Sequence, residues 1–113
     1  METGIIIAVI VLFLVWRMKP TKGVKSISAH QLKQELSDSN KVFIDVRTPG
    51  EFKARNIKQF KNMPLGSDLS KLPKDKEIVV ICQSGMRSAQ ACKQLKKLGY
   101  EKVTNVRGGM GAY

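Results

Sequence analysis

The sequence predicts an α/β fold in which a small parallel sheet is flanked by helices and preceded by one transmembrane helix. Two observations predict it. Short runs rich in β-branched residues alternate with helix-like segments, which is the pattern of a parallel sheet covered on both faces. Ahead of them lies an apolar run at 4–16 that contains no charged residue. The 113 residues allow one small domain behind that run.

The individual elements follow from local patterns. Ser28 and Gln31 have the spacing of a capping box at a helix start, Pro49 suits the first position of a helix, and Gly99 suits a helix end. The expected strands are 24–27, 42–46, 60–63, 78–81 and 102–106. The expected helices begin at 28 and cover 48–53 and 89–98, with a turn or one-turn helix at 67–72 and a last helix that is short or missing.

The most informative segment is a buried strand that ends at a cysteine. A run of β-branched residues at 78–81 is followed by Cys82, by a short polar loop, and by the helix at 89–98. Ligands of parallel sheets gather at the carboxyl ends of strands, where loop N–H groups and a helix start can hold an anion. We therefore expect Cys82 to have a depressed pKa and to act as a nucleophile. The alternative is a buried core cysteine.

Three segments resemble the rhodanese family, and they occur in the family's order over residues 26–113. The first is the Cys82 loop, in which a cysteine closes a strand and five further loop residues lead to a helix. Upstream, the run from Asp45 through Arg47 to Glu51 and Phe52 is similar to the signature near the start of rhodanese domains. Downstream, the run 106–109, with its Gly-Gly pair, resembles the turn after the family's last strand.

This resemblance implies a sulfurtransferase and a small five-stranded rhodanese-like fold. Sulfane sulfur would pass from thiosulfate or a persulfide donor to a thiophilic acceptor through a persulfide on Cys82. The loop that binds the substrate and the persulfide would consist of Gln83, Ser84, Gly85, Met86 and Arg87. Asp45 and Arg47 would support the site, although Arg47 and Glu51 are also spaced to pair with each other.

Two other functions stay open at this point. Cysteine phosphatases on a similar fold resemble Cys-x5-Arg, whereas this chain has Cys82 and Arg87 separated by four residues and places Ser88 where that arginine would be. The shorter loop disfavours a phosphatase. Arg87 is expected to steer and hold an anionic donor, the alternatives being a structural salt bridge or a surface charge. A non-catalytic, membrane-tethered binding module is the second alternative.

The apolar run predicts a division into a transmembrane anchor at 1–18, a basic linker at 19–25 and a rhodanese-like domain at 26–113. A cleaved secretory signal would need a basic start and a small-residue cleavage site, whereas the start carries Glu2 and nothing after Trp16 resembles Ala-x-Ala. Basic residues lie only on the C-terminal flank of the anchor. The positive-inside rule therefore predicts a single-pass membrane protein with the N-terminus outside and the domain in the cytoplasm.

Composition bears on cofactors and partners. Two cysteines and one histidine offer no metal-ligand cluster, so we expect neither metal nor cofactor, and Cys92 is expected in the core. The net charge of +11 fits a small anionic sulfur donor, an acidic partner protein, anionic lipid beneath the anchor, or simply a solvated surface. The acceptor is a thiol or a protein that the sequence does not name. Few aromatic residues argue against nucleic acid.

Overall fold

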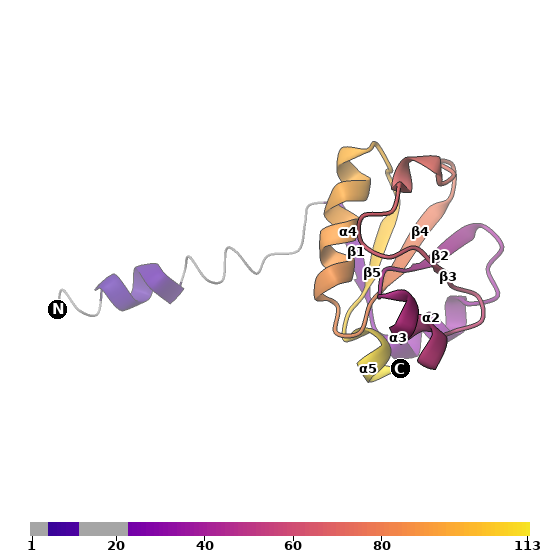
Figure 1. Ribbon diagram of the computed structural model, residues 1–113. Coiled ribbons are helices and arrows are strands. Elements are labelled where there is room, and N and C mark those ends of the chain that lie inside the picture. Colours follow the sequence, from indigo (N-terminus) through magenta and orange to yellow (C-terminus); the bar gives the residue numbers. More distant parts are fainter. Residues whose placement is uncertain (1–4, 12–22) are drawn as a thin grey trace.

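The computed structural model describes residues 5–11 and 23–113, and its centre is a five-stranded parallel sheet (Figure 1). The strand order is β1-β5-β4-β2-β3, and every pair of neighbours is parallel. The strands are β1 (Val24–Ile27), β2 (Lys41–Asp45), β3 (Lys61–Asn62), β4 (Glu77–Ile81) and β5 (Val103–Val106). This confirms the predicted parallel five-stranded sheet. All five strands end at the same side, which we call the carboxyl edge, and β4 lies at the centre.

Helices cover both faces of the sheet. The helices of this part are α2 (Ala29–Glu35), α3 (Pro49–Ala54), α4 (Met86–Lys97) and α5 (Gly109–Ala112), with a 3-10 turn η1 (Leu69–Lys71). One apolar cluster joins α4 and η1 to the sheet, and a second joins α2 and α5 to its other face. In Figure 1, α3 and α5 lie together at the lower end of the sheet, which is its carboxyl edge.

The central strand explains the uninterrupted β-branched run. Ile78 and Val80 pack into the cluster beneath α4, while Val79 and Ile81 pack into the cluster beneath α2. All four side chains are fully buried. A strand that is buried on both faces has no solvent-facing position, so its sequence does not alternate with polar residues.

Local signals place most helix starts correctly. Ser28 and Gln31 form the expected capping box, and Pro49 occupies the first turn of α3. The helix α4 starts at Met86, earlier than the predicted start at 89, because Gly85 with a φ of +100° ends the loop early and serves as the N-cap. The sheet already includes Val24 as part of β1, within the range assigned to the linker.

The predicted membrane anchor and localisation need correction. Among residues 5–11 and 23–113, no helix is long and apolar enough to cross a membrane. This finding overturns the prediction of a transmembrane helix and of a single-pass protein with a cytoplasmic domain. The rest of the predicted anchor, 1–4 and 12–18, and most of the linker lie outside the described residues.

Tyr100 ties η1 to the end of α4, and its removal tests that contact. The single proton of the phenol has two carbonyl oxygens within reach, those of Leu69 and Leu72 at 2.8 and 2.6 Å, and the side chain is buried. We expect Tyr100→Phe to lower the free energy of unfolding by about 1–3 kcal/mol, because buried carbonyls lose a donor. Urea denaturation measures this change. The matched control is Tyr113→Phe, and an equal loss in the two variants would contradict the assignment.

Candidate active site

Cys82 follows the last residue of β4 at the carboxyl edge, and its loop folds around the sulfur. The Gly85 N–H donates to the Cys82 Sγ at 3.0 Å, and the Ser88 hydroxyl lies 3.3 Å from the same atom. The Cys82 side chain is 0% exposed, so the loop covers the sulfur in the resting state. The loop turns this sharply because Gly85 adopts a positive φ, which side chains disfavour.

The environment of Cys82 favours the thiolate. Burial alone raises the pKa of this thiol, but the hydrogen bond from the Ser88 hydroxyl opposes the shift. The backbone N–H groups of Ser88, Gly85 and Ser84 oppose it as well, and the net pKa is lowered from its ordinary value of 9.0. A thiolate is the nucleophilic form of cysteine. The sequence-based expectation of a depressed pKa therefore agrees with the geometry.

The Ser88 hydroxyl has one proton and two acceptors within reach. It lies 2.5 Å from the Asn105 Oδ1 as well as 3.3 Å from the Cys82 sulfur. The Asn105 amide is itself fixed because its Nδ2 donates to the Gly85 carbonyl at 3.3 Å. Ser88 therefore donates either to Asn105 or to Cys82. A negative charge on the sulfur favours the second arrangement, since charge strengthens a hydrogen bond.

The start of α5 packs directly on the backbone of the Cys82 loop. The Met110 N–H donates to the Cys82 carbonyl at 2.8 Å, and the Gly111 N–H donates to the Gln83 carbonyl at 2.9 Å. Gly109 makes this approach possible, because a Cβ at that position would overlap the Cys82 carbonyl oxygen, and its φ of +55° also favours glycine. The Gly-Gly turn thus has a physical role in holding the loop.

Asp45 and Arg47 form a buried brace beside the loop. The Arg47 guanidinium contacts both Asp45 carboxylate oxygens at 2.8–3.1 Å. It also donates to the Arg55 carbonyl at 2.6 Å and to the Gln83 Oε1 at 3.5 Å. Arg47 therefore links the end of β2, the end of α3 and the Cys82 loop. Its contact with Glu51 is to the backbone oxygen, so the side-chain pair that their spacing allows does not form.

Arg87 is bound by a carboxylate rather than exposed as a free cation. Its two terminal nitrogens donate to the Glu51 Oε1 and Oε2 at 2.7 and 2.9 Å. This bond, with those from Thr48, lowers the pKa of Glu51 to about 2, and the same pairing raises the pKa of Arg87. The structure thus realises the salt bridge that the sequence left open for Arg87, and it joins α3 to the start of α4.

The second cysteine is separate from this chemistry. Cys92 lies on α4, is fully buried and is not disulfide-bonded. Burial, with a smaller effect of Cys82, raises the pKa of its thiol to about 12. The expectation that Cys92 faces the core is confirmed.

The loop residues around the covered sulfur form the local surface. Gln83, Ser84 and Met86 are exposed, and Met86 is 77% exposed although it is a large apolar side chain. Of the predicted loop residues, Gly85 contacts the sulfur through its backbone N–H, at 3.0 Å. The other loop residues shape what a molecule approaching Cys82 would meet.

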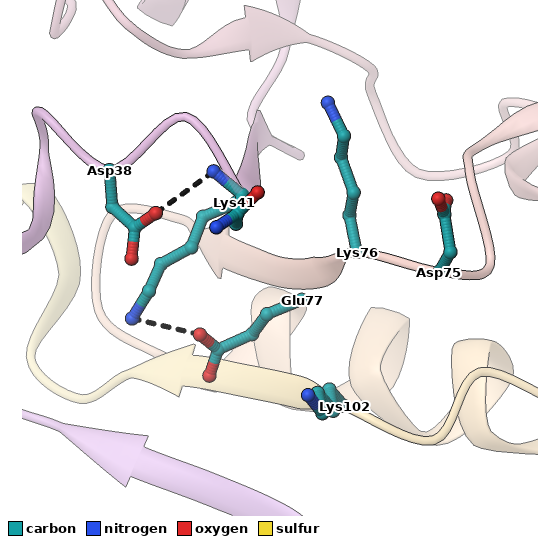
Figure 2. Close-up of a pocket in the computed structure, with 7 residues that line it drawn as sticks. Asp38, Lys41, Asp75, Lys76, Glu77 and Lys102 are labelled. Carbon is teal, nitrogen blue, oxygen red and sulfur yellow. Dashed lines mark hydrogen bonds and ion pairs between the residues drawn. The ribbon is translucent and has the colours of Figure 1, made fainter.

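A pocket of about 320 Å³ lies away from Cys82, at the edge where the strands begin (Figure 2). Lysines and carboxylates alternate around it, and Figure 2 shows the Lys41 ammonium directed at Glu77. Its lining residues are Asp38, Asn40, Lys41, Asp75, Lys76, Glu77 and Lys102. Because Lys41 is held by Glu35 and Glu77, at 2.9 and 2.8 Å, these charges serve to hold α2, β2 and β4 together. None of the residues expected at the site lines this pocket.

Sequence reasoning missed three parts of the site. Ser88 stands out in the sequence only by its spacing from Cys82, Asn105 lies in a strand without a motif, and the spacing of Glu51 from Arg47 does not reveal its pairing with Arg87. A polar residue near the end of a buried strand, as at Asn105, was the one available hint. The contact between α5 and the loop depends on folding and has no local signature beyond the glycines.

Comparison with known proteins places this arrangement in a family. The model of the rhodanese-like domain matches residues 28–113. The chain belongs to the rhodanese-like domain family. A protein of Allochromatium vinosum named sulfurtransferase is 38% identical over 94 residues, which cover 80% of this chain and 88% of that protein.

Solved structures agree with the rhodanese-like assignment. A rhodanese-like domain protein from Staphylococcus aureus has a TM-score of 0.69 and 34% identity, covering 78% of this chain and 89% of that one. An NAD-dependent persulfide reductase from A. fulgidus has a TM-score of 0.62 and 32% identity, covering 80% of this chain but only 16% of that one. Homologues named as sulfurtransferases support sulfur transfer in general for this rhodanese-like domain.

The hydroxyl of Ser88 can be tested through the acidity of Cys82. In the wild type, we expect the rate at which iodoacetamide alkylates Cys82 to rise with pH around a midpoint below 9. Ser88→Ala should move that midpoint to higher pH, because the thiolate loses a hydrogen-bond donor. Intact-mass spectrometry at a series of pH values measures the rate. Ser84→Ala is the control, because it removes a hydroxyl but keeps the N–H group. An unchanged midpoint in Ser88→Ala would contradict the assignment.

Proposed function

We propose that this rhodanese-like domain is a sulfurtransferase that carries sulfane sulfur as a persulfide on Cys82. The observation that carries the proposal is the cradle of the Cys82 sulfur, which receives the Gly85 N–H and lies within reach of the Ser88 hydroxyl. Family membership and the name of the Allochromatium vinosum relative support sulfur transfer as the general reaction.

The reaction consists of two displacements at sulfur. The Cys82 thiolate attacks the sulfane sulfur of the donor, a new S–S bond forms, and the donor's own S–S bond breaks. Sulfite leaves when the donor is thiosulfate, and a thiolate leaves when the donor is a persulfide. An acceptor thiolate then attacks the outer sulfur of the Cys82 persulfide, and the Cys82 thiolate departs with the electron pair. No external oxidant or reductant is consumed, and the intermediate is covalent.

Preorganised donors stabilise the charge on sulfur during both steps. Backbone N–H groups of the loop are fixed before the reaction, because α5 and the Gly85 turn already hold the backbone. The Ser88 hydroxyl changes partner between Asn105 and the sulfur, which suits a site whose charge appears and disappears. Asp45 holds Arg47, and Arg47 supports the loop through its contact with Gln83.

The two paired arginines, Arg47 and Arg87, favour a persulfide donor over thiosulfate. Glu51 offsets Arg87, and Asp45 offsets Arg47, so neither arginine offers a free positive charge to a dianion. A persulfide carries at most one charge on its sulfur and gains less from a free arginine. The structural similarity to part of the NAD-dependent persulfide reductase from A. fulgidus also supports a persulfide as the donor.

The phosphatase alternative is disfavoured by the same contacts. A cysteine phosphatase needs an arginine that is free to bind the phosphoryl group, whereas Arg87 is held by both oxygens of Glu51. At the position where that arginine would stand, Ser88 lies against the nucleophile's sulfur.

Intact-mass spectrometry after incubation with cysteine persulfide, and separately with thiosulfate, tests the function. We expect the wild type and Cys92→Ser to gain the mass of one sulfur atom that cyanide removes, and Cys82→Ser to gain none, because Cys92 is buried and its thiol pKa is about 12. We also expect faster loading from the persulfide. Absence of an adduct with both donors would contradict sulfur transfer and favour a binding module.

A further inference from the structure

Carboxylates are distributed unevenly between the two ends of the sheet. The edge where the strands begin carries Glu35, Asp38, Asp75, Glu77 and Glu101. Beside the Cys82 loop, within the described part of the chain, the side-chain carboxylates of Asp45 and Glu51 are each bound by an arginine. These two carboxylates are therefore not free to offset further positive charge beside the loop.

Exposed cations without a carboxylate partner lie on the segments that flank the Cys82 loop. Arg107 directly follows β5, and its Cα lies 3.7 Å from the position that a Cβ on Gly85 would take, so its backbone packs against the loop. Arg55 reaches from the end of α3 to the Met110 carbonyl of α5. Lys53 is exposed on α3. None of these three takes part in the ion pairs found among residues 5–11 and 23–113.

An apolar contact point lies within this basic surface. Met86 is 77% exposed and follows Gly85, whose N–H contacts the Cys82 sulfur. Within 23–113 the other exposed large apolar side chain is Leu65, at 42%. Its N–H is bonded to the Val46 carbonyl, at the end of β2, so Leu65 also belongs to the carboxyl edge. Exposed methionine is typical of protein-binding surfaces.

We propose that the carboxyl edge around Cys82, with Lys53, Arg55, Met86 and Arg107, is a docking face for an acidic partner protein that exchanges sulfur with Cys82. The proposal rests on the proposed function, because the partner is the donor or the acceptor of the same sulfur. The Cys82 sulfur is covered by its own loop. A partner protein must therefore contact the surface around that loop before its donor or acceptor sulfur can react with Cys82. Complementary charge raises the rate of such an encounter and orients it.

The composition of the face favours a protein over a nucleic acid. Single-stranded nucleic acids bind through aromatic side chains on which bases stack. Among the described residues, the exposed large apolar side chains are isoleucine, valine, leucine and methionine, and none is aromatic. Methionine and leucine supply apolar contact without a flat stacking surface.

Charge reversal on the full chain tests the docking face. The probes are short peptides that carry one cysteine persulfide flanked by glutamates or by lysines, with free cysteine persulfide as the reference donor. The docking variant is Lys53→Glu with Arg107→Glu. The matched control is Lys97→Glu with Lys102→Glu, which removes the same charge from exposed positions near the opposite edge. Circular dichroism verifies that both variants fold, and intact mass measures the rate at which Cys82 is loaded.

The measurement is made at about 0.15 M salt, where the Debye length is about 8 Å and distant charges are screened. We expect the wild type to take sulfur from the glutamate peptide about tenfold faster than from the lysine peptide. The docking variant should lose most of this preference, and the control variant should retain it within about twofold. Free cysteine persulfide should load the wild type and both variants at similar rates.

The outcomes separate the two proposals. Equal loading rates with the two peptides would overturn the docking face, and so would an equal loss of the preference for the glutamate peptide in the two variants. If free cysteine persulfide still loads Cys82 in these cases, the proposed sulfurtransferase function stands. Failure of every donor to load Cys82 would overturn the proposed function, and the docking face with it. Tighter binding of a uridine oligonucleotide than of the glutamate peptide, lost in the docking variant, would assign the face to nucleic acid and contradict the proposal.

Discussion

The close approach of α5 to the Cys82 loop is the constraint on which the rest of the site depends. Two backbone hydrogen bonds, from Met110 and Gly111, fix the carbonyls of Cys82 and Gln83, and Gly109 is the residue that leaves room for them. With its carbonyls held, the loop directs its N–H groups inward at the sulfur. Burial alone would raise the pKa of Cys82, and the hydrogen bonds from Ser88, Gly85 and Ser84 in this held loop lower it.

Charge is divided between the interior of the site and its surface. The buried Arg47 and the partly exposed Arg87 are each neutralised by a carboxylate and serve as braces between elements. The charge on sulfur is therefore stabilised by hydrogen-bond donors that cost no rearrangement. Outside, cations such as Arg107 remain unpaired around an exposed Met86. A neutral cradle within a basic surface suits a small sulfur atom delivered by a larger acidic partner.

The sequence predicted the parts of the fold that depend on local pattern. The β-branched run of β4, the capping box at Ser28 and the cysteine at the strand end each carry their signal within a few residues. The partner of Glu51 and the role of Asn105 depend on contacts between segments far apart in the chain, which no local pattern encodes. The apolar N-terminal run predicted a membrane span from composition alone, whereas no helix among residues 5–11 and 23–113 is long and apolar enough to cross a membrane.

Amide hydrogen exchange at Met110 and Gly111 tests the central constraint most directly. If α5 holds the Cys82 loop, these two N–H groups exchange as slowly as those of Val79 and Val80 in the central strand, because both sets open only when the domain unfolds. NMR spectroscopy of the labelled chain measures each amide separately. Exchange of Met110 and Gly111 at the rate of freely solvated amides would contradict the account, since the loop would then have no fixed backbone to aim at the sulfur.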